Sequence, residues 1–229
     1  MYYSRISNTE QRYLVYLPPC FELSNRQYPT IYLLHGSEND ETHWEQLGVF
    51  QKMDQGLAEG RLAPAIIVLP DGDPNLFINT SGGLHSFEGQ LVSELVPVID
   101  RLFNTDPRPE TRAIGGISRG GVWSLEIGFL HPELFSVVGG HSPCLNLNES
   151  PPQWDPLALA EEPSLNAQRI WLDAGDADYC QPGAEALHNA LDEVGVAHEY
   201  QVWPGAHQDS LWAEHLPAYL EFYTRAWPK

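Results

Sequence analysis

The amino-acid sequence predicts a single α/β domain with a mostly parallel central sheet and helices on both faces. Apolar runs of strand length alternate along the chain with helical patterns, as in proteins built from successive β-α units. Several of these runs lack the polar–apolar alternation that an exposed sheet face would produce, so both faces are expected to be covered. The length of 229 residues suits one domain that spans 1–229.

Each expected element rests on a local pattern. In the second helix, for example, Leu91, Leu95 and Leu102 recur at helical spacing and mark one buried stripe. The expected strands span 13–17, 30–34, 65–69, 112–117, 136–140, 169–173 and 198–202. The expected helices span 44–59, 86–103, 119–130, 183–193 and 209–227.

Three long connections separate these elements, at 37–43, 71–85 and 142–168. Each follows the carboxyl end of a strand, the edge at which open α/β sheets bind ligands. A loop as long as 142–168 inside a compact domain is usually either functional or disordered. We expect 142–168 to form a small cap over the site.

The composition excludes several classes of partner and site. A net charge of -19 and a pI near 4.6 argue against nucleic acid and anionic membranes as partners. Three cysteines, Cys20, Cys144 and Cys180, are too few and too scattered for a disulfide framework, and no spacing resembles a zinc site. We therefore expect no structural or catalytic metal.

The first residues indicate no targeting segment. They contain neither a basic stretch nor the apolar stretch of a signal peptide. A cytoplasmic location is expected, although a secreted chain that has lost its leader would look the same.

The most specific motif is Gly-Ile-Ser-Arg-Gly at 116–120, where an expected strand gives way to an expected helix. A Gly-x-Ser-x-Gly sequence at such a turn is the nucleophile elbow of the α/β-hydrolase fold. The serine takes a strained conformation that lifts its hydroxyl above the sheet, and glycines on either side let strand and helix pass closely. Ser118 is the candidate nucleophile.

A serine nucleophile needs a base and a carboxylate that orients the base. Among nine histidines, His207 follows the last expected strand and a Pro-Gly turn, which places it at the same sheet edge as Ser118. For the acid, one turn offers Asp173, Asp176 and Asp178. We favour Asp178, which lies farthest into the loop, with Asp176 as the next choice. The order nucleophile, acid, histidine is that of α/β hydrolases.

Acyl transfer also needs N–H groups where negative charge develops on the carbonyl oxygen. One donor is expected from the backbone of Arg119, the residue after the nucleophile. The other is expected from the turn after the strand at 30–34, where we favour the N–H of Ser37 with Gly36 as the alternative. His35 is expected to brace this turn.

Taken together, these segments resemble the putative esterase family of α/β hydrolases, which includes esterase D, feruloyl esterases, enterochelin esterase-like proteins and mycolyltransferases. The resemblance implies Ser118 as nucleophile, Asp178 as acid and His207 as base. It runs from about Arg12 to Trp227 and is carried by Ile-Tyr-Leu-Leu-His-Gly at 31–36, Gly-Ile-Ser-Arg-Gly-Gly at 116–121, His-Pro-Glu-Leu-Phe at 131–135, Gly-Asp-Ala-Asp at 175–178 and Gly-Ala-His at 205–207.

Two positions depart from the family pattern. Arg119 stands where many members carry methionine, and we expect its side chain to pair with an acidic neighbour. Trp123 stands where the family usually has a small or aliphatic residue, which would alter the packing behind the elbow.

The sequence thus predicts a serine carboxylic-ester hydrolase that forms an acyl-enzyme on a small to medium ester, with an aryl ester of feruloyl type as one candidate. Trp44, Phe77 and His141 are expected to help shape the pocket. No metal or organic cofactor is expected, and the partner is a small-molecule ester; the oligomeric state is not predicted. Two alternatives stay open: an acyltransferase of the same fold, and an inactive binding protein that kept the fold.

Overall fold

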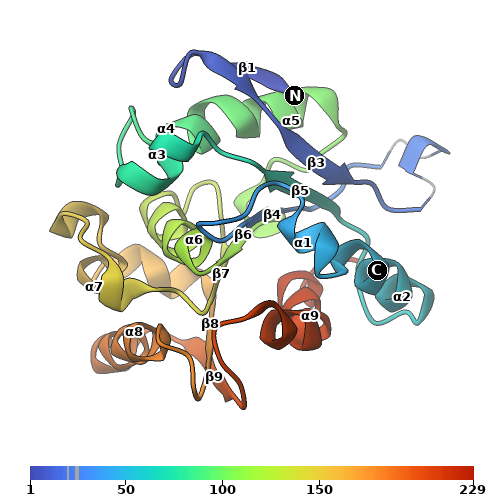
Figure 1. Ribbon diagram of the computed structural model, residues 1–229. Coiled ribbons are helices and arrows are strands. Elements are labelled where there is room, and N and C mark those ends of the chain that lie inside the picture. Colours follow the sequence, from blue (N-terminus) through green and yellow to red (C-terminus); the bar gives the residue numbers. More distant parts are fainter. Residues whose placement is uncertain (20, 24–25) are drawn as a thin grey trace.

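The computed structural model describes residues 1–19, 21–23 and 26–229, so Cys20 lies outside the described residues. Its centre is a seven-stranded sheet in the order β3-β5-β4-β6-β7-β8-β9 (Figure 1). β3 is antiparallel to β5, and the other neighbouring pairs are parallel. The strands are β3 (Tyr13–Tyr16), β4 (Thr30–Leu34), β5 (Ile66–Pro70), β6 (Arg112–Ile117), β7 (Val137–His141), β8 (Arg169–Gly175) and β9 (His198–Trp203).

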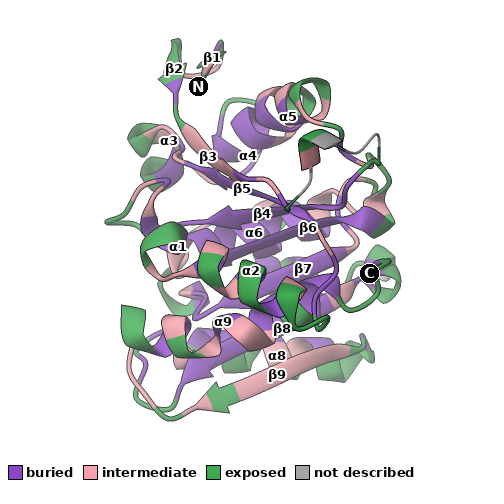
Figure 2. Cartoon of the chain, turned by 90° about the vertical axis from the view of Figure 1, so that its right-hand side faces the viewer, coloured by how far each residue is buried: buried purple, intermediate pink, exposed green. Residues whose placement is uncertain are grey.

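Helices cover both faces of this sheet. Figure 2 shows α2 and α9 in front of the strands, with α6 and α8 behind them. In the described part of the chain, no helix is both long and apolar enough to span a membrane. The helices are α1 (His43–Gln46), α2 (Val49–Ala58), α3 (Pro74–Asn79), α4 (Phe87–Gln90), α5 (Val96–Leu102), α6 (Arg119–Leu130), α7 (Pro156–Leu159), α8 (Gln181–Val194) and α9 (Asp209–Thr224).

Two hydrophobic clusters fill the space between the sheet and its helices. Along β4, Ile31 and Leu33 belong to the cluster with α2 and α9, whereas Tyr32 and Leu34 belong to the cluster with α6 and α8. Successive side chains of a strand point to opposite faces, so β4 is apolar throughout because both faces are buried. The predicted α/β class is confirmed.

The expected helix at 44–59 is wrong in one respect, because it is broken into α1 and α2. Gly48 separates them with φ 95°, a left-handed conformation that glycine adopts at little cost. The expected helix at 86–103 is present, but its middle turn, Leu91–Leu95, is a π-helix between α4 and α5.

The sequence did not indicate three smaller features. A two-stranded antiparallel hairpin joins β1 (Tyr2–Ser4) and β2 (Thr9–Gln11). Helix α3 lies inside the connection at 71–85, where the carboxylate of Asp73 caps it by accepting from the N–H groups of Asn75 and Leu76. The segment 142–168 contains α7 and the short 3₁₀ turns Leu145–Leu147, Pro152–Trp154 and Pro163–Ala167.

Candidate active site

Ser118 lies at the sharp turn between β6 and α6. Its backbone has φ 59° and ψ -117°, a conformation that costs a non-glycine residue roughly 1–3 kcal/mol. A Cβ on Gly116 would lie 2.1 Å from the carbonyl oxygen of Gly120, and a Cβ on Gly120 would lie 2.3 Å from the carbonyl oxygen of His35. Neither position has room for a side chain. The turn therefore has the backbone geometry of a nucleophile elbow.

Ser118, His207 and Asp178 meet at the carboxyl edge of the sheet. The Oγ of Ser118 lies 2.9 Å from Nε2 of His207. Nδ1 of His207 donates to Asp178, at 2.8 Å from Oδ1 and 3.0 Å from Oδ2. A carboxylate only accepts hydrogen bonds, so the proton is on Nδ1 and Nε2 can accept from the serine hydroxyl. The three residues follow β6, β8 and β9, and the structure brings them into one hydrogen-bonded chain.

The carboxyl group of Asp178 is buried yet stays ionised. Burial by itself raises its pKa, but hydrogen bonds from His207 and from the Cys180 N–H, at 2.7 Å, outweigh burial and lower the pKa below its ordinary value. A carboxylate held in this state fixes the orientation of the imidazole and can stabilise it when it takes up a proton.

The two alternative acids are occupied elsewhere. Oδ1 of Asp176 accepts from the N–H of Gly205 at 2.9 Å and so braces the turn before His207. The carboxylate of Asp173 is fully buried, where it accepts from Nδ1 of His141 at 3.0 Å and from Nε1 of Trp171 at 2.7 Å. Of the three aspartates, Asp178 is the one hydrogen-bonded to His207.

A cavity of about 490 Å³ opens beside Ser118. Ser37 and Arg119 lie in its wall, whereas the N–H of Gly36 is directed at Nδ1 of His43, 3.5 Å away. The N–H of Ser37 as the second oxyanion donor, with Gly36 as the alternative, stays a prediction. The other polar side chains of the wall are Asn79, Thr80, Ser81, Asn148, Glu149 and Ser150, and the apolar or aromatic ones are Ile78, Val122, Leu147 and Tyr179.

The turn that carries Ser37 is braced by His35. Nε2 of His35 lies 2.6 Å from the carbonyl oxygen of Asp71, and its ring stacks on Phe77 with centroids 4.4 Å apart. These contacts tie the end of β4 to the segment after β5, as the sequence predicted for this residue.

The Arg119 side chain corrects a sequence-based expectation, because its hydrogen bonds go to neutral oxygens rather than to an acidic neighbour. Its guanidinium donates to the carbonyl oxygens of Phe77 at 3.1 Å and Thr80 at 2.6 Å, and to Oδ1 of Asn148 at 3.4 Å. It also lies over the ring of Trp123, 4.8 Å from the centroid. Burial lowers the pKa of Arg119. The side chain thus joins the 71–85 and 142–168 segments across the cavity wall.

The structure also corrects the expected pocket residues Trp44, Phe77 and His141. All three are buried in the core, at 1%, 1% and 0% exposure, and lie outside the cavity wall. The indole of Trp44 donates to the carbonyl oxygen of Leu34, and its ring packs edge-on against His141. Phe and Trp are highly buried on average in folded proteins, so their residue type alone does not indicate a place in a cavity wall.

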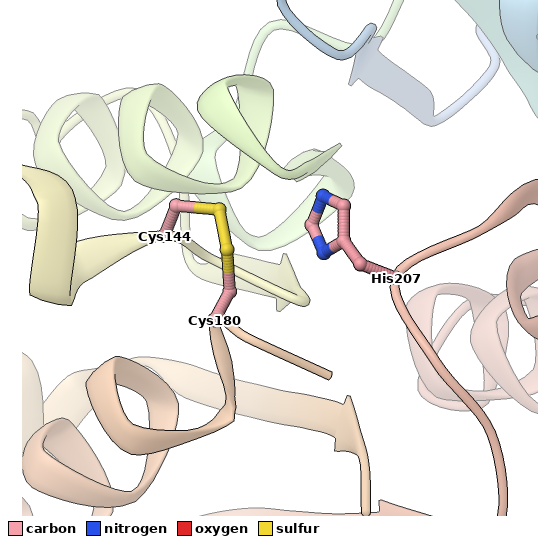
Figure 3. Close-up of side chains that lie close together, drawn as sticks. All are labelled: Cys144, Cys180 and His207. Atoms are coloured by element: carbon pink, nitrogen blue, oxygen red, sulfur yellow. A yellow bond between two sulfur atoms is a disulfide. The ribbon is translucent and has the colours of Figure 1, made fainter. Parts of the chain in front are cut away.

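A disulfide joins Cys144 and Cys180, although three scattered cysteines did not indicate a disulfide framework in the sequence. Figure 3 shows it beside His207. Cys144 Sγ lies 3.6 Å from Ser118 Oγ, and Cys180 follows Asp178 by two residues. Because disulfides persist mainly in oxidising compartments, this pair weighs against the expected cytoplasmic location, which stays a prediction.

The disulfide was missed because its two cysteines are 36 residues apart. Cys144 follows the end of β7 and Cys180 follows the end of β8. The two strands are neighbours in the sheet. The adjacency of β7 and β8 would have suggested this pair, but the order of the strands in the sheet cannot be read from the sequence.

Only part of the expected cap borders the cavity. Cys144, Leu147, Asn148, Glu149 and Ser150 line it, at the start of the 142–168 segment. Later residues of the segment, Leu159, Ala160 and Leu165, are buried in the hydrophobic cluster beneath. That the whole segment 142–168 acts as a cap over the site stays a prediction.

Comparison with known proteins places this geometry in a family. The family model described as "Putative esterase" matches residues 4–223. An endo-1,4-beta-xylanase/feruloyl esterase from Xylanibacter ruminicola is 31% identical over 219 residues, which cover 88% of this chain. The matched region spans 29% of that relative's length.

Solved structures agree on the fold. A ferulic acid esterase superposes with a TM-score of 0.88 at 25% identity, covering 98% of this chain and 96% of the other. An S-formylglutathione hydrolase from Staphylococcus aureus superposes with a TM-score of 0.81 at 17% identity, covering 97% and 96%. The fold is that of the α/β hydrolases, and the chain belongs to the "Putative esterase" family.

Proposed function

We propose that the protein is a serine carboxylic-ester hydrolase in which Ser118, His207 and Asp178 form the catalytic triad. One observation carries the proposal: the hydrogen-bonded chain from Ser118 Oγ through His207 to Asp178 begins at a strained elbow and borders a cavity. Membership in an esterase family supports the same reaction class.

In the proposed reaction, Ser118 Oγ attacks the ester carbonyl carbon while Nε2 of His207 takes the serine proton. The N–H groups of Arg119 and Ser37 would stabilise the oxyanion of the tetrahedral intermediate. His207 then returns the proton to the departing alcohol, which leaves an acyl group on Ser118. Water, deprotonated by His207, releases the acid and restores the serine. Every step uses groups of this chain, the ester and water.

An aryl ester of feruloyl type is the substrate class that we propose. Two proteins similar to this chain, the Xylanibacter ruminicola relative and the structure at TM-score 0.88, are named feruloyl or ferulic acid esterases. The cavity wall supports the proposal, since Ile78, Val122, Leu147 and Tyr179 offer apolar contacts for a ring and the neighbouring hydroxyl and amide groups offer hydrogen bonds.

A panel of esters tests the substrate class. The panel contains methyl ferulate, methyl 3-phenylpropanoate and 4-nitrophenyl esters of two to eight carbons, and kcat/KM is measured for each. We expect methyl ferulate to exceed methyl 3-phenylpropanoate by about tenfold or more. Equal values, or a clear preference for short unbranched acyl groups, would contradict the aryl assignment but leave the esterase assignment standing.

A fluorophosphonate probe tests the nucleophile and separates an esterase from an inactive binding protein. We expect covalent labelling of the native chain and none of Ser118→Ala. If the probe abolished the activity of the native chain without labelling it covalently, that result would contradict the triad. Adding an alcohol acceptor and measuring the new ester separates a hydrolase from an acyltransferase of the same fold.

A further inference from the structure

A group of three potential metal ligands lies away from the active site. His188 and Asp192 are on α8, one turn apart, and His198 begins β9. Their ligand atoms all lie within 4.8 Å of one another. Parallel strands place the start of β9 at the sheet edge opposite Ser118, so this group is separate from the triad. We propose that His188, Asp192 and His198 bind a divalent transition-metal ion of the zinc type.

The two imidazoles already point at each other. Nδ1 of His188 lies 2.7 Å from Nε2 of His198. Nδ1–H of His198 donates to the carbonyl oxygen of Val196 at 2.8 Å, which fixes the tautomer and makes Nε2 of His198 the acceptor of the His188 Nδ1–H. A metal-binding histidine is commonly oriented by such a backbone hydrogen bond on its other nitrogen.

The carboxylate of Asp192 completes the group from the next turn of α8. Its Oδ2 lies 3.7 Å from Nε2 of His188, and its Oδ1 lies 3.9 Å from Nε2 of His198. Residues four apart on a helix share a face, so His188 and Asp192 can contact one ion together. Two imidazoles and a carboxylate suit zinc, with water as the fourth ligand.

Binding requires a small rearrangement and no net loss of protons. At present the His188 Nδ1–H donates to His198, so an ion would take the place of this proton, which moves to Nε2 of His188 beside Asp192. Zinc–nitrogen bonds of about 2.1 Å in tetrahedral geometry hold the two nitrogens roughly 3.4 Å apart. The His188 side chain is 28% exposed and that of Asp192 is 64% exposed, so both can move to open this space.

Two features of the surroundings favour a cation here. The ring of Tyr200 stacks on His188 with centroids 4.5 Å apart, which limits the rotation of that imidazole. The chain carries a net charge of -19, which raises the concentration of cations near its surface.

The described residues contain one other three-ligand group of this kind, Cys144, Cys180 and His207. Its sulfurs are joined in the disulfide, and its imidazole is hydrogen-bonded to Ser118 and Asp178. That group is therefore not available to an ion in the oxidised protein. An ion at the proposed site would instead join the end of α8 to the start of β9.

Calorimetric titration of the chelator-treated full chain with zinc chloride tests the proposal. We expect one tight site per chain with a micromolar or lower Kd, and at least a tenfold weaker Kd in Asp192→Asn and His198→Gln. His85→Gln, which removes an exposed histidine outside the group, is the matched control and should bind as the native chain does. Circular dichroism of each variant verifies folding, and the exposed Asp192→Asn keeps the test usable if His198→Gln misfolds.

Cobalt provides a second measurement. Co²⁺ in place of zinc should give the intense visible absorption of a tetrahedral site in the native chain and in His85→Gln, and lose most of it in Asp192→Asn. The proposal is wrong if the Kd of the native chain for zinc is millimolar or weaker. It is also wrong if the native chain and Asp192→Asn bind zinc with the same Kd. Zinc held instead by His207 would show this second result.

Discussion

Two chains of hydrogen bonds in this protein have the same order, aspartate to imidazole to hydroxyl. In one, Asp178 accepts from His207, and His207 faces the hydroxyl of Ser118. In the other, Asp173 accepts from Nδ1 of His141, whose Nε2 lies 2.8 Å from the hydroxyl of Tyr223. We assign catalysis to the first chain only, and its environment explains why.

The environments differ in access. The side chains of His141 and Asp173 are both 0% exposed, and Tyr223 is buried with a pKa raised well above its ordinary value, first by burial. Ser118, in contrast, lines a cavity on a strained turn. Such a chain of hydrogen bonds can be catalytic only where its hydroxyl can reach the carbonyl carbon of a substrate. Inside the core, the same chain of hydrogen bonds holds neighbouring elements together.

Removing the terminal hydroxyl of each chain should give the largest contrast. We expect Ser118→Ala to lower kcat by roughly 10⁴-fold or more with the fold intact. Tyr223→Phe should change kcat by less than about threefold while lowering the free energy of unfolding by roughly 1–3 kcal/mol, because Nε2 of His141 loses its partner. Steady-state kinetics and urea denaturation measure both. A large loss of kcat in folded Tyr223→Phe would mean that the buried chain takes part in catalysis.

Replacing each of the two aspartates with asparagine should distinguish an aspartate that orients the catalytic imidazole from one that stabilises the fold. An amide in place of the catalytic acid favours the wrong imidazole tautomer, so Asp178→Asn should lose about 10³-fold or more in kcat. Asp173→Asn should lose roughly 3 kcal/mol of stability but keep kcat within about tenfold for the folded fraction.

Asp176→Asn is the control for this pair, because it alters the same turn as Asp178 without touching His207. We expect less than about a tenfold loss of kcat and a small change in melting temperature. If Asp176→Asn were the more damaging variant, the acid would have to be reassigned to that position.

The disulfide adjoins the hydrogen-bonded series Asp178–His207–Ser118, because Cys144 Sγ lies 3.6 Å from Ser118 Oγ and the Cys180 N–H donates to Asp178. Removing it should therefore affect this series more than the buried one. The double variant Cys144→Ala/Cys180→Ala frees the backbone beside Asp178, and we expect kcat to fall by about three- to tenfold and stability by roughly 2–4 kcal/mol. Dithiothreitol should lower the activity of the native chain in the same way and leave the double variant unchanged. Equal sensitivity of both proteins to the reductant would contradict this role.

Acid pH should give the smallest effect. The pKa of Asp178 is lowered in the folded state, so its hydrogen bonds contribute stability that is fully present above about pH 4, the ordinary aspartate value, and is lost as pH falls through the lower folded value. The native chain should therefore lose more stability between pH 5 and pH 3 than Asp178→Asn. Urea midpoints at the two pH values measure this difference, and equal losses would contradict it.

The sequence predicted the central strands well because β4, β5, β6 and β7 are buried on both faces, so that apolar residues follow one another along most of their length. Residues 30–34 and 112–117 coincide with β4 and β6. Features set by a single backbone angle or by very short pairing were not predicted. Examples are the break at Gly48 and the three-residue strands β1 and β2.

The residues of the candidate site also differ in how well the sequence predicted them. Ser118 and His207 were found from motifs that tie a residue type to a turn, and these residues lie together in the structure. Asp178 could be ranked but not separated from Asp176, since both lie in one turn and only the fold shows which carboxylate reaches His207. The pocket wall was not predicted, because it depends on side-chain direction, as the burial of Trp44 illustrates.

The position of β9 has a consequence for how activity is lost on denaturation. β9 is the last strand of the sheet, half-exposed along most of its length, and it pairs only with β8 (Figure 2). It lies three strands from β6, about 14 Å at the usual spacing, so the loop after β9 must return across the sheet edge to place His207 beside Ser118. Edge elements open locally at lower free energy than the core. Mildly denaturing conditions should therefore abolish activity while the centre of the sheet is still folded.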